Sequence, residues 1–193
     1  MNVNVPVRCT VIKMNDGGLL VHNPVAPTRE CVDIVKGLER LHGPVKYIVL
    51  GTVALEHKAF IGPFSQYFLN ADIWLQPGQW SFPINIPNVF AGFPLFKKIN
   101  TIPSNSTVCP WSNEIDHIVL DPIEFKSVGK FSETAFYHKE TKTLIVTDII
   151  VKVTDKPPAI IEEDPRAILF HSRDNMTQVI QDDAETRLRG WRR

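Results

Sequence analysis

The stretch YIVLGTVALEHKAF, from Tyr47 to Phe60, decides the predicted fold. The overlapping run Lys46 to Thr52 is continuously apolar, which is typical of a β-strand buried on both faces of a sheet. A Glu-His pair, Glu56 and His57, follows at the expected carboxyl end of this strand. Because ligand sites in α/β sheets form at that end, we expect a functional site here.

The segments around this strand predict an alternation of strands and helices. A β-hairpin is expected before it, with strands at Arg8–Met14 and Gly18–Val25 around a turn that contains Asp-Gly and Gly-Gly pairs. Thr28 can cap a helix that Gly43-Pro44 ends, and a short helix at Phe60–Phe68 is expected before a strand at Ala71–Leu75. This order predicts parallel crossover units in a layered α/β sheet.

A proline-rich segment, Pro77 to Pro110, interrupts this alternation. Its six prolines and several aromatic residues exclude long regular elements and predict a long, packed loop. The loop can be interpreted as a lid or partner-binding surface, or simply as an irregular segment that covers the sheet.

The second half of the chain is expected to return to strands. Strands are predicted at Ile115–Leu120, Glu133–His138 and Thr143–Val153, with a hairpin turn between the last two. Residues 172–193 are predicted to form a polar helical segment, because Glu185 and Arg189 have helical i,i+4 spacing. We expect residues 1–193 to form a single domain.

Composition limits the functional classes. Lysine plus arginine and aspartate plus glutamate number 21 each among 193 residues, so no net charge attracts the chain to nucleic acid. Cys9, Cys31 and Cys109 form neither a disulfide framework nor a CxxC pair, which favours a reducing compartment. No apolar run reaches the ~18 residues of a membrane span. We therefore expect a soluble protein that binds neither nucleic acid nor a membrane.

The stretch around His57 resembles the metallo-β-lactamase fold family, in which such a strand is followed by the metal-binding motif His-x-His-x-Asp-His. On that pattern His57 matches the last histidine and Glu56 replaces the aspartate. The first two histidines fall on Thr52 and Ala54, and neither side chain can replace an imidazole on zinc. The resemblance implies a metal site that has been largely lost.

A second part of the chain, GKFSETAFYHKETKTLIVTD from Gly129 to Asp148, resembles the later metal-binding part of the same family. Asp148 matches the bridging aspartate, whereas Lys130 stands where a histidine ligand is expected. A protonated ammonium group has no lone pair for a metal, so Lys130 is expected either to replace the ion by pairing with Asp148 or Glu56, or to extend into solvent from a surface turn. His22 stands in place of an early aspartate, and His171 is a candidate for the last ligand.

A narrower likeness concerns the phrases LLVHNPVAPT, LEHKAFIGPF and TAFYHKETKTLIVTD. These are similar to an uncharacterised branch of the superfamily that is common in plants, algae and some bacteria. The resemblance implies an α/β fold, an αββα layered sandwich truncated at its carboxyl-terminal end. It also implies a plastid location for many members, so plastid and cytoplasm are both expected locations.

Three functional interpretations follow. The first is a non-catalytic protein that binds a small molecule or a protein partner and has no cofactor. The second is a metal-dependent hydrolase with an altered mononuclear zinc or iron site built from Glu56, His57, Asp148 and His171. The third is a subunit of a larger assembly, with residues 77–110 at its interface. We favour the first, because a zinc hydrolase needs three or more protein ligands for each metal and only His57 and Asp148 clearly remain.

Overall fold

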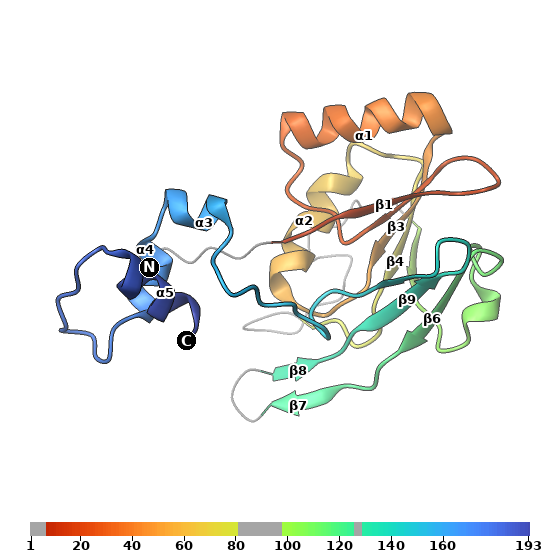
Figure 1. Cartoon of the computed structure of the whole chain (residues 1–193). Helices are drawn as coiled ribbons and strands as arrows, with labels where there is room; N and C mark the ends of the chain where they lie inside the picture. The colour runs from red at the N-terminus through yellow and green to blue at the C-terminus, as the bar shows by residue number, and fades with distance from the viewer. Residues whose placement is uncertain (1–6, 81–97, 126–128) are drawn as a thin grey trace. The chain divides into compact units, whose positions relative to one another are not determined.

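A computed structural model describes residues 7–80, 98–125 and 129–193, with the backbone alone for 124, 125 and 129 (Figure 1). The chain has the mixed α/β character expected from its sequence. Its described residues divide into two compact units, 7–150 and 151–193, each with packing of its own.

The first unit is built on a sheet in which the described strands have the order β1-β2-β3-β4-β5. β1 is antiparallel to β2, whereas β2 through β5 run parallel to their neighbours. Helix α1 connects β2 to β3, and α2 connects β3 to β4, which confirms the predicted parallel crossovers. The bounds are Thr10–Lys13 (β1), Leu19–His22 (β2), Arg29–His42 (α1), Val45–Leu50 (β3), Leu55–Ser65 (α2), Asp72–Leu75 (β4) and Ile99–Thr101 (β5).

A second, antiparallel sheet of the same unit has the strand order β10-β9-β6. Its strands are β6 (Ile115–Val119), β9 (Thr134–His138) and β10 (Thr143–Ile145), and the short 3₁₀ helix η2 (Ser106–Val108) precedes them. β7 (Ile123–Phe125) and β8 (Gly129–Phe131) form a separate antiparallel ribbon. An isolated bridge between Thr52 and Glu133 joins the segment after β3 to the residue just before β9.

Local signals explain the best-predicted elements. The β1–β2 turn uses Gly17 and Gly18 at φ values of 81° and 87°, a region that favours glycine. The Thr28 side chain accepts a hydrogen bond from the Cys31 amide at the start of α1, and Gly43 ends the helix at φ 96°. The predicted hairpin and first helix are therefore confirmed.

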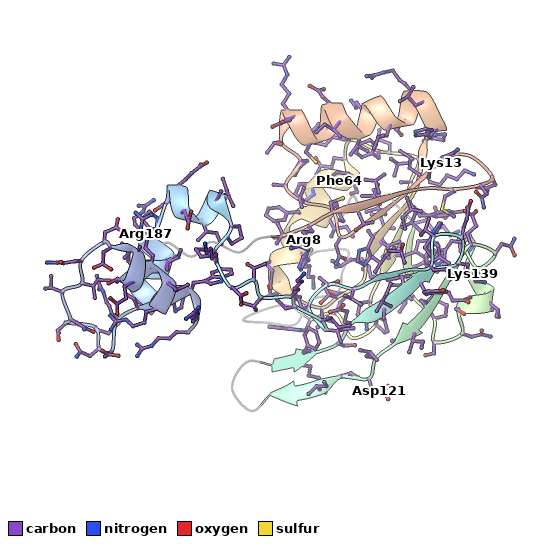
Figure 2. All side chains as sticks on the ribbon, in the orientation of Figure 1. Arg8, Lys13, Phe64, Asp121, Lys139 and Arg187 are labelled. Carbon is purple, nitrogen blue, oxygen red and sulfur yellow. The ribbon has the colours of Figure 1, made fainter. Side chains whose placement is uncertain are left out.

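The core of this unit lies on both faces of the first sheet. Helices α1 and α2 lie on one face, and the second sheet lies on the other (Figure 1). Successive residues of β2 and β3 point to opposite faces, as strand geometry requires. The helix-side core includes Leu19, Val21, Val35, Ile48, Leu50, Ile61 and Phe64, the last of which is labelled in Figure 2. The core between the sheets includes Leu20, Val49, Trp111, Ile115, Phe136 and Ile145.

These layers agree only partly with the expected αββα sandwich. Among the described residues of the 7–150 unit, the order is helices, sheet and second sheet. The outer face of the second sheet exposes Ile118, Tyr137 and Leu144. A fourth, helical layer is not seen within the described part of this unit, so the complete sandwich stays a prediction.

Several predicted bounds were wrong. Helix α2 begins at Leu55 rather than Phe60, so His57 lies in its first turn. The strand expected at Thr143–Val153 ends at Ile145, and the β7–β8 ribbon was not predicted. Of the expected long loop at Pro77–Pro110, residues 81–97 lie outside the described part, whereas its later residues contain β5 and η2.

The second unit contains three described helices, α3 (Ala159–Glu163), α4 (Arg166–His171) and α5 (Ala184–Trp191). The polar helical segment predicted at residues 172–193 is therefore helical only in its last part, at α5. α4 and α5 pack closely at Gly190, where an added Cβ would lie 1.9 Å from the Ile168 carbonyl oxygen. None of the helices in the described ranges is both long and apolar enough to span a membrane.

Candidate functional site

Buried polar residues gather where the parallel strands of the first sheet end. His22 ends β2 and Asn23 follows it, Thr52 follows β3 and Gln76 follows β4, and all four are buried. Parallel strands bring their carboxyl ends to one edge of a sheet, which is where α/β proteins place ligand sites. These buried polar residues therefore lie at the edge of the sheet where the sequence predicts a functional site.

His57 and Asp148 meet at this edge. The Nε2 atom of His57 lies 3.9 Å from an Asp148 carboxylate oxygen. The His57 side chain is only 7% exposed, whereas that of Asp148 is 39% exposed. The structure thus brings together the two residues that matched the family motifs most closely, with Asp148 as the more accessible of the two.

Glu133 holds Asp148 in this position. One of its carboxylate oxygens accepts a hydrogen bond from the Asp148 amide at 2.8 Å, and the other accepts one from the Thr147 amide. The Glu133 side chain is fully buried, so burial raises its pKa, while these amide bonds act in the opposite direction. Both acceptor atoms are therefore occupied by the backbone of the segment that carries Asp148.

The electrostatics of Asp148 are unfavourable for its ionised form. Burial raises the pKa of Asp148, nearby His57 lowers it and the carboxylate of Glu56 raises it again. Glu56 and His57 occupy the first turn of α2, opposite the segment that Glu133 holds. The edge therefore concentrates carboxylates around one imidazole.

Two amide side chains join this edge to the second half of the unit. The Asn23 side chain accepts from the Gly51 amide at 2.8 Å and donates to the Thr147 hydroxyl at 2.6 Å. Gln76 donates to the Ser132 hydroxyl at 2.6 Å, and its carbonyl oxygen accepts from the Thr134 hydroxyl. Because these amides are buried and satisfied, they fix the strand ends against the segment that carries Glu133.

His22 is a buried histidine of a different kind. Its Nε2 has no hydrogen-bond partner among the described residues, and its ring lies edge-on to Phe136 at a centroid distance of 5.2 Å. A Cβ at Gly51 would lie 2.6 Å from this Nε2, so the imidazole occupies the space that a side chain there would need. Burial, together with neighbouring His57, lowers the pKa of His22 to about 3. His22 is therefore neutral at physiological pH.

The described residues at this edge do not supply a complete donor set for a zinc or iron centre. The Thr52 hydroxyl accepts from the Ala54 amide at 3.2 Å, and Ala54 is the N-cap of α2. Within the described ranges, no three histidine, cysteine, aspartate or glutamate side chains come together as a metal-binding group. A zinc site needs at least three protein ligands, whereas the ion pair seen between described side chains at this edge joins two, His57 and Asp148.

The remaining predicted site residues, Lys130 and His171, belong to β8 and α4. Lys130 is an exposed residue of β8, where its backbone pairs with that of Glu124. Asp148 forms an ion pair with His57. The ion pair expected between Lys130 and Asp148 or Glu56 is not seen among the described side chains. His171 belongs to α4 of the 151–193 unit, so its part in a site stays a prediction.

Comparison with known proteins identifies a family. The model of a domain of unknown function, DUF4336, matches residues 1–193, the whole chain. The chain belongs to this family. No curated protein and no solved structure matches it. Membership in the DUF4336 family therefore supplies no reaction or ligand, and the likeness to metallo-β-lactamases rests on the sequence motifs.

Proposed function

We propose that this DUF4336 protein is a non-catalytic, metallo-β-lactamase-like binding protein whose ligand is a small molecule with a positively charged group. The observation that supports the proposal is the position of Asp148, held by Glu133 through backbone amides and placed 3.9 Å from His57. The Asp148 carboxylate is partly exposed and lies beside the His57 imidazole, so it is the residue that would receive the ligand.

Charge at the edge favours a cationic ligand. The carboxylate of Glu56 raises the pKa of Asp148, and His22 is neutral because burial lowers its pKa to about 3. A cation placed beside Asp148 would favour the ionised form of this carboxylate and would relieve the unfavourable charge. An ammonium group on a small molecule supplies that charge without the ligand shell that a metal needs.

A metal-dependent hydrolase is the second candidate, and the contact between His57 and Asp148 is the observation that favours it. A bound metal would lower the pKa of a water molecule and make it a nucleophile. The limited donor set argues against this candidate, because Thr52 and Ala54 supply no imidazole at the two motif positions.

A ligand screen tests the proposed function. Small primary amines are compared with their N-acetylated counterparts by the shift in melting temperature, in the protein and in Asp148→Asn. We expect amines to stabilise the parent protein, and we expect the acetylated compounds and the Asp148→Asn variant to show no such shift. Asp121→Asn, a change at an exposed aspartate labelled in Figure 2, is the matched control and should retain the shift.

Elemental analysis separates the two candidates. Protein purified without added metal or chelator is expected to hold less than about 0.2 equivalents of zinc, iron or manganese. We also expect no hydrolysis of β-lactams or thioesters. About one equivalent of metal that Asp148→Asn removes, together with hydrolysis, would support the hydrolase instead.

A further inference from the structure

Helix α1 carries an apolar stripe on the side that faces away from the sheet. Ile34 is 59% exposed and Leu41 is 75% exposed, and they lie seven residues apart with Gly37 between them. Positions 34, 37 and 41 fall on one face of a helix, whereas Val32 and Val35 are buried on the opposite side. Figure 1 shows α1 on the outside of the 7–150 unit, so its outer side is open within that unit.

Packing against the described residues does not explain Gly37. A Cβ added there would meet only an Arg40 guanidinium nitrogen at 3.7 Å, which is ordinary van der Waals contact. A glycine inside a helix is about 1 kcal/mol less favourable than alanine. Glycine does allow the backbone of another helix to approach closely, which would explain its place in the middle of the stripe.

Charges along one border of the stripe point to a particular partner. Asp33 and Arg40 are both exposed, lie seven residues apart and flank the stripe on the same side. Two antiparallel copies of α1 would place each Asp33 beside Arg40 of the other copy, whereas in parallel copies this border would face the opposite border of the partner helix, so these two charges would not meet. In the single chain Asp33 reaches Arg29 at 3.8 Å, a highly exposed pair that contributes little and can rearrange.

We propose that two copies of this chain associate through α1, antiparallel and around a two-fold axis near Gly37. Ile34 of each copy then packs against Leu41 of the other, as the symmetry of such an interface requires. A shallow depression of about 620 Å³, lined by Arg29, Glu30, Asp33 and Ile34, lies beside the place where Leu41 of the second copy would dock. One helix face buries little area, so the dimer is weak and depends on protein concentration.

Sedimentation velocity over a range of concentrations tests the surface. We expect the full chain to form a reversible dimer, and Ile34→Glu or Leu41→Glu to weaken it at least about tenfold by burying an unpaired charge. Ile118→Glu is the matched control, because Ile118 is 68% exposed on the second sheet, away from α1. The proposal is overturned if the chain stays monomeric throughout, or if Ile118→Glu weakens association as much as the α1 changes.

A charge exchange tests the antiparallel arrangement. Asp33→Arg and Arg40→Asp are each expected to weaken the dimer, because each change sets like charges opposite one another twice in the symmetric pair. The double variant should restore association, because the opposite charges meet again with their places exchanged. A double variant no stronger than the single variants would overturn the arrangement. Circular dichroism of each variant shows whether α1 remains folded.

Discussion

His22 should make stability depend on pH. Its pKa falls from 6.5 to about 3 on folding, so the unfolded chain takes up a proton between these values and the folded chain does not. This contribution to stability is complete above pH 6.5 and is lost as pH falls toward 3. Between pH 7 and pH 5 the loss amounts to about 2 kcal/mol.

The measurement is urea unfolding of the protein and of His22→Leu at both pH values. Glu133 and Asp148 have raised pKa values and act in the opposite direction, so the comparison with His22→Leu isolates the histidine. His171→Leu, at an exposed histidine, should behave like the parent protein. An equal pH dependence in His22→Leu and the parent would contradict the prediction.

Glu133→Gln should destabilise the 7–150 unit. The carboxylate accepts from the Thr147 and Asp148 amides, and a glutamine would turn an NH₂ group toward one of these donors. The buried mismatch is expected to cost about 1–3 kcal/mol in the free energy of unfolding. Chemical denaturation measures it, with Glu140→Gln at an exposed glutamate as the control. Equal stability of the two variants would show that these hydrogen bonds are not needed.

Sequence reasoning reached part of the site and missed its support. His57 and Asp148 could be predicted because their residue types match a motif, and the structure brings them together. Glu133 was placed in a strand without a role, since nothing local shows that a glutamate will be buried against amides fourteen and fifteen residues later. The roles of Asn23 and Gln76 depend likewise on partners that only tertiary structure supplies.

Elements were predicted well where their ends carry a chemical signal. Thr28 and Gly43 mark α1, and both ends are where they were expected. Helix α2 has Ala54 at its N-cap, which makes no side-chain capping hydrogen bond, and Pro63 inside it. No capping residue in the sequence therefore indicated where this helix begins. The apolar run after Ile145 was read as strand, yet Ile150, Val151 and Val153 are exposed and unpaired with a described strand.

Gly190→Ala should separate α4 from α5. The new methyl group would lie 1.9 Å from the Ile168 carbonyl oxygen, which is backbone and cannot move without displacing the helix. We expect faster hydrogen exchange across residues 159–193 and little change across 7–150. Ala184→Gly, a change of the same size at an exposed position of α5, is the control. Unchanged exchange in Gly190→Ala would show that the helices do not pack as described.

At the scale of the whole molecule, the segment between the two units should be the place where a protease divides the chain. Lys152 is exposed and lies outside any helix or strand, at the start of the 151–193 unit. Brief trypsin treatment is expected to yield a fragment that ends at Lys152 and keeps a folded circular dichroism spectrum. Lys152→Gln should suppress this fragment in mass spectra. A fragment that unfolds on cleavage would show that the units depend on each other.

The close approach of His22 to Gly51 restricts which residues can occur together at positions 22 and 51 during evolution. A side chain at 51 would meet the imidazole at 2.6 Å and Phe136 at 3.1 Å, so position 51 cannot gain a side chain while His22 is kept. Family members with alanine or serine at 51 should therefore carry a smaller residue than histidine at 22. In laboratory evolution, a substitution at 51 should become acceptable only after residue 22 has become smaller, so the order of mutations is constrained as well as their identity.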